Sequence, residues 1–229
     1  MTSLRITNVH LVDPETQTVT LGSLTINNGR ISGADTADTL LDAEGQYLAP
    51  GIVDIGVKVC EPGERHKESF RSAGLAAAAG GVTTLVARPD TKPSVDSPET
   101  LEFASRRAQA NCIVHSYQMA ALTKGRLGRE MTEIGFLQDA GAIAFSDCDA
   151  VITDNKVLSR ALTYASQLGA LIIGHPQDPS LSKGASATSG KFASLRAIPA
   201  VSTMAERLGL ERDLAMVEMT GAKYHADQI

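Results

Sequence analysis

The sequence has few aromatic residues, no concentration of positive charge and no long apolar segment. Tryptophan is absent, and the aromatic residues make up 4% of the 229 positions. The 21 lysine and arginine residues are scattered and the formal net charge is −5, so the attraction that draws proteins onto nucleic acid backbones is missing. No apolar run approaches the roughly 20 residues of a transmembrane helix, and no segment resembles a signal peptide. We expect a cytoplasmic protein that binds neither nucleic acid nor membrane.

Cysteine is also scarce. Cys60, Cys112 and Cys148 are odd in number and widely spaced, which favours reduced thiols over a disulfide framework. With 43% apolar residues, the chain can build one sizeable core or a large and a small domain.

Two regions differ in their apolar pattern. Residues 1–49 alternate apolar and polar side chains, with turns at Asp13-Pro14 and Asn27-Asn28-Gly29, which predicts a small antiparallel sheet. From Pro50 onward, short apolar runs alternate with helical segments, which predicts a parallel sheet wrapped by helices. We therefore divide the chain into domains 1–49 and 50–229.

The second region supplies about six strands. They are predicted at 52–57, 82–87, 113–119, 142–145, 171–174 and 223–228, and the helices at 68–79, 98–110, 130–139, 156–168 and 194–220. A closed eight-stranded barrel takes about 250 residues by itself. We therefore expect an incomplete barrel in preference to an open doubly wound sheet, and we expect the chain to be a fragment or the ordered part of a longer protein.

Several motifs occur together in a characteristic order. They are Ala49-Pro-Gly-Ile-Val-Asp54, Glu61-Pro-Gly-Glu-Arg-His-Lys-Glu68, Ala76-Ala-Ala-Ala-Gly-Gly-Val-Thr-Thr84, Arg88-Pro-Asp-Thr-Lys-Pro93, Gly190-Lys-Phe-Ala-Ser-Leu-Arg196 and Ile198-Pro-Ala200. On these motifs, which extend over essentially the whole chain, the sequence resembles the dihydroorotases of the amidohydrolase superfamily. The resemblance implies an α/β fold, a (β/α)8 TIM barrel that is incomplete in this chain. It also implies that residues 1–49 are the N-terminal part of a composite β-sandwich.

The resemblance further implies a zinc site at the carboxyl end of the barrel. In the family, one or two zinc ions activate the water that opens the cyclic amide of dihydroorotate, in pyrimidine biosynthesis. Carried over motif by motif, the metal-ligand positions here are Gly56, Lys58, Cys148, His175 and Gln228. Glycine has no donor, and a protonated lysine repels a dication. We therefore expect the protein to bind no cofactor.

The substrate-binding positions of the family have changed as well. Cys60 stands where the family has an arginine that grips the substrate carboxylate, and Asp90 stands where it has an asparagine. A carboxylate at position 90 repels an anionic substrate. No catalytic residue is therefore intact among the positions carried over.

Each of these residues also has a plain structural interpretation. Lys58 is either a cation that replaces the lost metal among Asp147, Asp149, Asp90 and Asp54, or a solvated lysine at the barrel mouth. His175 is expected to hydrogen-bond a neighbour, His225 to be a packing or surface residue, and the Cys60 and Cys148 thiols to fill space.

Three functions are consistent with these residues. The first is a catalytically inactive dihydroorotase-like protein that forms homo-oligomers and, as the resemblance implies, assembles with aspartate carbamoyltransferase. The second is an active zinc-dependent cyclic amidohydrolase with a rebuilt site, for example Cys60, Cys148 and His175 around one zinc. The third is a module that binds a small molecule at the barrel mouth without converting it.

Overall fold

The computed structural model describes residues 3–229, and the chain divides into two compact units, Met1–Ile52 and Val53–Ile229. The predicted boundary between residues 49 and 50 lies just before this division. Each unit is described by itself below. Within the described residues, no helix combines the length and apolarity needed to cross a lipid bilayer.

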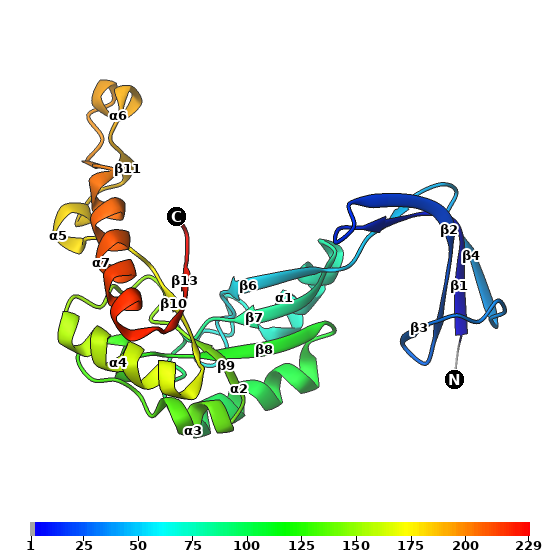
Figure 1. Ribbon diagram of the computed structural model, residues 1–229, viewed down its shortest axis with the longest axis horizontal. Coiled ribbons are helices and arrows are strands. Elements are labelled where there is room, and N and C mark those ends of the chain that lie inside the picture. The colour runs from blue at the N-terminus through cyan, green and yellow to red at the C-terminus, as the bar shows by residue number, and fades with distance from the viewer. Residues whose placement is uncertain (1–2) are drawn as a thin grey trace. The chain divides into compact units, whose positions relative to one another are not determined.

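The first unit is a five-stranded sheet (Figure 1). Its strands are β1 (Ser3–Asp13), β2 (Thr18–Asn27), β3 (Arg30–Ser32), β4 (Thr39–Asp42) and β5 (Tyr47–Leu48). The pairs β1–β2 and β2–β3 are antiparallel, but β4 and β5 both run parallel to β1. The prediction of a wholly antiparallel sheet was therefore wrong, because apolar alternation reports which face of a strand is buried and not the direction of its neighbour.

Large apolar side chains of this sheet are exposed within its own unit. Val9 and Thr25 are its buried residues, whereas Leu21, Ile31 and Leu40 are between 65% and 76% exposed. An apolar hollow of about 560 Å³ lies beside β2, lined in part by Leu11 and Leu24. The expectation that this sheet belongs to a composite β-sandwich stays a prediction.

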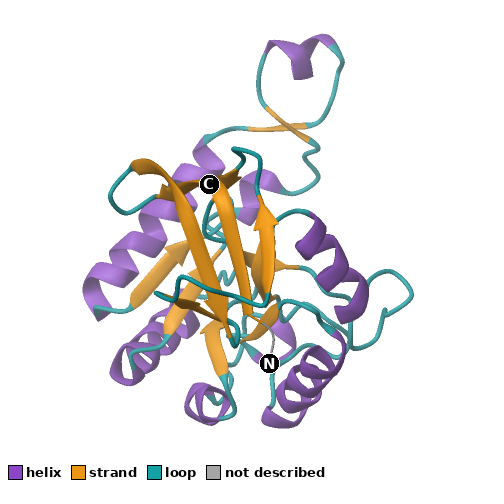
Figure 2. Cartoon of the chain, turned by 90° about the vertical axis from the view of Figure 1, so that its right-hand side faces the viewer, coloured by secondary structure: helices purple, strands orange, loops and turns teal. Residues whose placement is uncertain are grey.

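The second unit contains a six-stranded sheet that curls into part of a barrel (Figures 1 and 2). The strands follow one another in the order β6 (Ile52–Val57), β7 (Val82–Ala87), β8 (His115–Ala120), β9 (Ala142–Phe145), β10 (Leu171–Gly174) and β13 (Lys223–Ala226). The pairs from β7 to β13 are parallel. Neighbouring strands are also consecutive along this series, as the prediction of an incomplete barrel requires.

Helices follow the strands. They are α1 (Phe70–Ala79), α2 (Pro98–Asn111), the 3-10 turn η1 (Lys124–Arg126), α3 (Ile134–Asp139), α4 (Asn155–Leu168), α5 (Pro179–Ser182), α6 (Lys191–Leu195) and α7 (Met204–Thr220). The longer helical region predicted over 194–220 is helical only in part, since α6 ends at Leu195 and α7 begins at Met204. Pro199 lacks a backbone N–H, and its ring disfavours helical geometry at Ile198, so the chain leaves α6 and forms the short strand β12 (Ala200–Val201) before α7 begins.

Local sequence explains where these helices begin and end. Ser69 caps α1 and exchanges hydrogen bonds with Ser72, and Ser97 and Thr100 form the same capping box at α2. Helix α4 ends at Gly169, whose φ of 65° lies in the left-handed region that glycine adopts without strain.

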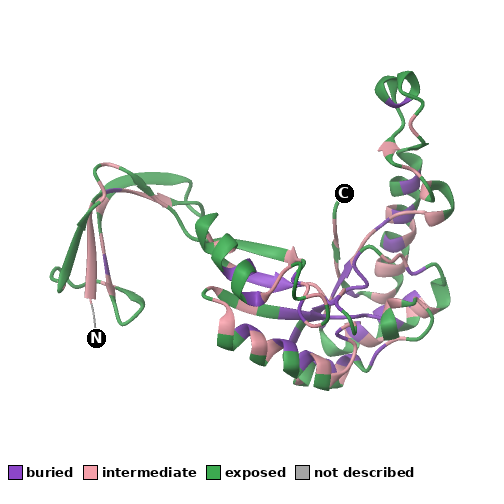
Figure 3. Ribbon diagram, turned by 180° about the vertical axis from the view of Figure 1, so that it is seen from behind, coloured by how far each residue is buried: buried purple, intermediate pink, exposed green. Residues whose placement is uncertain are grey.

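The helices cover only one face of the curled sheet, which rules out a doubly wound arrangement. Buried residues gather where helices meet strands, for example Leu101 of α2 and Leu162 of α4 (Figure 3). The other face is packed by strand residues alone, among them Val86, Met119 and Ile173. Since parallel strands end at one edge of a sheet, the loops after β6, β7, β9, β10 and β13 lie at one mouth, where sites occur in such folds.

Candidate functional site

The loop after β6 places Lys58 at the mouth of the curled sheet. The Nζ atom of Lys58 lies 2.9 Å from Oδ2 of Asp90, in the loop after β7. The prediction that Lys58 contacts a mouth carboxylate is confirmed, although its side chain is still 56% exposed. The contact with Asp90 raises the pKa of Lys58, so this lysine is a cation at neutral pH.

Asp90 is the most deeply buried member of this group, with 2% of its side chain exposed. A second cation, Arg88 at the end of β7, places NH2 3.3 Å from Oδ2 of Asp90. Neither carboxylate oxygen of Asp90 accepts a well-directed hydrogen bond from the described residues, and Nε of Arg88 donates none. Asp90 is therefore balanced chiefly by charge, from one exposed and one buried cation.

The loop after β9 contributes Asp147, Cys148 and Asp149, whose side chains differ in burial and in contacts. Asp147 is buried and accepts hydrogen bonds from the backbone N–H groups of Leu122 and Thr123 at 3.0 and 2.9 Å, and from the Thr123 hydroxyl. Burial raises the pKa of Asp147, and these hydrogen bonds partly oppose the rise. Asp147 therefore fastens the loop to the end of β8 and does not contact Lys58.

Asp149 extends the ion-pair network at the mouth. Its Oδ1 atom lies 2.5 Å from NH2 of Arg126 and 3.7 Å from NH2 of Arg88. Burial acts to raise the pKa of Asp149, but the charges of Arg126 and Arg88 outweigh it and the pKa is lowered. Lys58, Arg88, Asp90, Asp149 and Arg126 thus form a continuous set of opposite charges, here termed the mouth ion-pair network.

Cys148 lies between these two aspartates with its side chain buried and its φ at 56°. Burial raises the pKa of its thiol, and the nearby Arg88 charge only partly opposes this. The Cys148 thiol is therefore protonated at neutral pH.

The histidines lie around two small cavities that share Cys148. The first, of about 30 Å³, is lined by His175 and Tyr224, and the second, of about 10 Å³, by Gly56 and His225. Nδ1 of His175 is buried and finds no partner among the described residues, so the expected hydrogen bond is not formed by this atom. These volumes match a water molecule or less.

Of the remaining predicted positions, Gln228 and Cys60 line neither cavity, whereas Gly56 lines the second. Gln228, after β13, is exposed, has a φ of 59° and lines neither cavity, whereas His225 and Asp227 line the second. Gly56, with a φ of 105°, presents only backbone there. Cys60 is partly buried and forms no disulfide.

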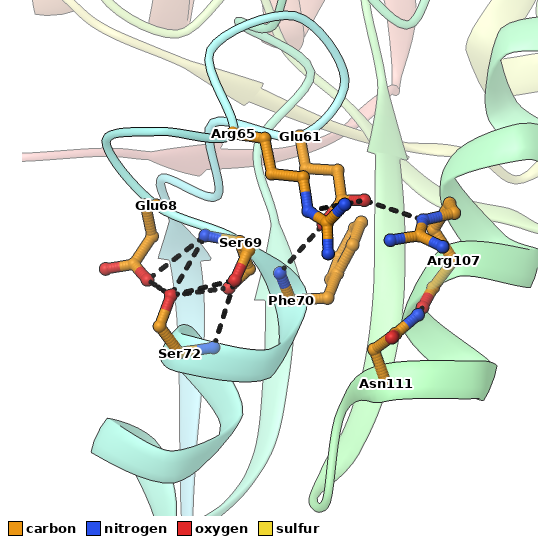
Figure 4. A network of polar contacts seen from close by, with 8 residues as sticks. All are labelled: Glu61, Arg65, Glu68, Ser69, Phe70, Ser72, Arg107 and Asn111. Atoms are coloured by element: carbon orange, nitrogen blue, oxygen red, sulfur yellow. Dashed lines mark hydrogen bonds and ion pairs between the residues drawn. The ribbon is translucent and has the colours of Figure 1, made fainter.

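The loop that carries Lys58 and Cys60 is anchored by the buried Glu61 (Figure 4). Glu61 Oε1 accepts a hydrogen bond from Nε of Arg107 at 2.6 Å, and Oε2 accepts one from the backbone N–H of Phe70 at 3.2 Å. Arg65 approaches the same carboxylate at 3.8 Å. The loop that carries Lys58 and Cys60 is thus held in place by contacts to a buried carboxylate.

The residues present do not fit a zinc ion. Across residues 3–229, no three His, Cys, Asp or Glu side chains converge in a way that could hold a metal. This includes Cys60, Cys148 and His175, the three donors of the rebuilt site considered above. Lys58 instead places an ammonium group next to Asp90, and like charge there opposes a dication.

Sequence reasoning missed two members of the mouth ion-pair network, Arg88 and Arg126. A signal for Arg88 was present, because it stands two residues before Asp90 in the segment Arg88-Pro-Asp-Thr-Lys-Pro93, where the resemblance implies an asparagine at position 90. Two opposite charges in one motif indicate an ion pair. Arg126 gave no such signal, because its approach to Asp149 depends on the fold of the loop after β8.

Comparison with known proteins agrees with the fold and motifs described above. Residues 45–229 match the model of a family described as dihydro-orotase-like. The chain belongs to the dihydro-orotase-like family. Among its relatives, a dihydroorotase of Syntrophus aciditrophicus (strain SB) is 37% identical over 222 residues, which cover 94% of this chain and 52% of that protein. A dihydroorotase-like protein of Pseudomonas putida is 35% identical over 99% of this chain and 55% of its own length.

Solved structures support the same architecture. The L-hydantoinase (dihydropyrimidinase) from Arthrobacter aurescens matches 98% of this chain and 52% of its own, with a TM-score of 0.79 and 18% sequence identity. A D-hydantoinase matches with a TM-score of 0.73 and 20% identity. At this identity the match concerns the fold alone. The dihydro-orotase-like chain spans about half the length of the curated relatives it matches.

Proposed function

We propose that this chain belongs to a catalytically inactive dihydroorotase-like protein of pyrimidine biosynthesis that acts as an assembly partner of aspartate carbamoyltransferase. The single observation that carries the proposal is the 2.9 Å contact between Lys58 and Asp90. It places a fixed cation at a metal-ligand position of the family and pairs it with an anion at a substrate-binding position.

This pair removes two requirements of the family's reaction at once. Without zinc there is no activated water, a contribution of several kcal/mol to lowering the barrier. Without the arginine at position 60, the carboxylate of dihydroorotate loses the clamp that the family provides, and the buried Asp90, which pairs with Lys58 and Arg88, offers no hydrogen-bond donor in its place. Dihydroorotate turnover should therefore be undetectable.

The second support is the contrast between the mouth and its framework. The loop around Glu61, the capping boxes of α1 and α2 and the anchored Asp147 are all well formed. A fold that is maintained while its chemical positions are replaced is expected of a protein whose outer surface carries the function. The partner itself comes from family resemblance.

The test is to co-express the full-length protein with the aspartate carbamoyltransferase of the same organism and to separate them by size exclusion with light scattering. The proposal expects one complex, formed equally by a His175→Ala variant, because the interaction does not use the mouth. Separate elution at micromolar concentration, with transcarbamoylase activity and stability unchanged, would contradict the assembly role. Dihydroorotate hydrolysis that scales with protein and disappears in His175→Ala would contradict the inactivity.

A second candidate, a small-molecule binding module, is favoured by one observation. The buried side-chain atoms without a well-directed hydrogen bond among the described residues are Nε of Arg88, both carboxylate oxygens of Asp90 and Nδ1 of His175. All belong to mouth residues, and of these atoms Oδ2 of Asp90 is compensated by its ion pairs with Lys58 and Arg88. Unsatisfied buried polar atoms are costly unless water or a ligand meets them. Calorimetric titration with dihydroorotate and with uncharged cyclic ureides distinguishes this module from the assembly protein.

A further inference from the structure

The hairpin that joins β2 to β3 in the first unit turns through two residues, Asn28 and Gly29 (Figure 1). Both have positive φ angles, 52° and 73°, as in a type I′ turn. Asn28 and Gly29 are exposed, and so is Asn27 before them. The turn therefore presents a carboxamide to solvent directly before the one residue type that has no side chain.

The main-chain nitrogen of Gly29 is unengaged. It donates no hydrogen bond to any acceptor within residues 3–229, and a Cβ atom built at Gly29 would meet no other atom within 4 Å. This nitrogen is therefore neither held by an acceptor nor shielded by a side chain of its own. Only main-chain and side-chain rotation at Asn28 separates it from the Cγ atom of the Asn28 carboxamide.

The other asparagines of the chain are restrained at one of these two groups. The Nδ2 atoms of Asn8 and Asn111 donate hydrogen bonds at 3.1 and 2.8 Å, and the backbone N–H that follows Asn155 donates one at 2.8 Å. Asn27 belongs to β2, and the residue after it carries a side chain. Asn28 is therefore the asparagine whose carboxamide and following nitrogen are both exposed and free among the described residues.

From this arrangement we infer that Asn28 is a site of spontaneous deamidation. The Gly29 nitrogen loses its proton and bonds to Cγ of Asn28, while the bond from Cγ to Nδ2 breaks and ammonia leaves, which closes a succinimide ring. Water then opens the ring at either carbonyl and yields aspartate or isoaspartate. Ring closure requires rotation of Asn28 out of the turn conformation, and β3 spans only three residues at the sheet edge, so this local opening costs little.

The modification acts on the apolar face of the first unit. In isoaspartate the main chain runs through the former side chain, which lengthens a turn whose length fixes the pairing of Asn27 with Arg30 and of Ile26 with Ile31. Ile26 and Ile31 line the apolar hollow beside β2. Either product also adds a negative charge at the end of this hairpin. Deamidation therefore loosens β3 and alters one wall of the hollow.

The test is peptide mass spectrometry of the full-length protein after incubation in mildly alkaline buffer, both folded and unfolded in urea. In the folded protein, Asn28 is expected to convert to aspartate and isoaspartate at least about tenfold faster than Asn27, the matched asparagine of the same hairpin. The unfolded sample is the positive control for the chemistry. Equal rates at Asn28 and Asn27 in the folded protein, or an intact Asn28 there after the unfolded sample has reacted, would overturn the inference.

Gly29→Ala tests the part played by the missing side chain. It should slow deamidation of Asn28 at least about tenfold, because a Cβ atom shields the attacking nitrogen, even though alanine at a φ of 73° loosens the turn. Gly33→Ala is the matched control, since Gly33 is exposed in the same unit, lies outside the left-handed region and has equal space for a Cβ atom. An unchanged rate in Gly29→Ala, or equal slowing by Gly33→Ala, would overturn the inference. These outcomes involve no metal, substrate or transcarbamoylase, so they are independent of the proposed function.

Discussion

Replacing Lys58 by methionine tests how strongly the mouth depends on this cation. At 2.9 Å, Coulomb's law gives roughly 6 kcal/mol at an effective dielectric constant near 20 and roughly 1.4 kcal/mol in bulk water. More than half of the Lys58 side chain is exposed, so solvent screening favours the lower value, and Arg88 still compensates Asp90 after the substitution. We expect Lys58→Met to lower the free energy of unfolding by about 1–2 kcal/mol.

The assay is a double-mutant cycle with Asp90→Asn, which supplies the asparagine of the family motif. Urea unfolding of the wild type, both single variants and the double variant gives the coupling energy directly. We expect a coupling of about 1 kcal/mol, with Lys58→Met nearly neutral once Asp90 is uncharged. A coupling below about 0.3 kcal/mol would refute the reasoning, because it would show that Lys58 and Asp90 do not stabilise one another.

Three further predictions concern the framework and the mouth. Glu61→Gln should lower the free energy of unfolding by about 1–3 kcal/mol, because it weakens the hydrogen bond from Arg107 and replaces a buried anion beside an arginine with a neutral amide. An unchanged midpoint of urea unfolding would contradict this. The pKa of Asp149 is lowered in the folded protein, so its stabilising contribution is present above the ordinary value of 3.8 and is lost as the pH falls through the folded-state pKa. The difference in unfolding free energy between wild type and Asp149→Asn should therefore vanish on acidification. A difference that persists at low pH would contradict the ion pairing. Burial and a raised thiol pKa should make Cys148 react with a thiol reagent more slowly than Cys60, as followed by peptide mass spectrometry, and equal rates would show that the Cys148 site is open.

The arrangement of strands in the second unit could be predicted because local signals agree there. Serine caps precede α1 and α2, a glycine in the left-handed region ends α4, and nearly continuous apolar runs form the parallel strands. The predicted strands at 52–57, 82–87, 142–145 and 171–174 coincide with those of the structure. The bounds of these segments could be predicted because the capping residues and the spacing of apolar residues agree.

Other features depend on spatial neighbours that a sequence does not reveal. The direction of β4 relative to β1 follows from the path of the chain between them, and alternation in β4 is the same for either direction. Pro199 is a visible signal in the sequence against a helix that continues through residues 195–203.

At the mouth, the contact of Lys58 could be predicted because the sequence places several carboxylates at the ends of the neighbouring strands. The choice of Asp90 over Asp147 as the partner could not be predicted. It depends on the hydrogen bonds that Asp147 accepts from the backbone N–H groups of Leu122 and Thr123. His225 is exposed, in agreement with its prediction as a packing or surface residue, and it also lines the second cavity with Gly56.

We propose that a protein cation, Lys58, occupies the place of the family's metal. It is tested most directly by elemental analysis of the full-length protein after zinc loading and dialysis, beside a His175→Ala variant. The account predicts zinc near zero in both proteins, since Lys58 is paired with Asp90 and no three ligands converge among residues 3–229. Close to one zinc per chain in the wild type, lost in His175→Ala, would contradict it.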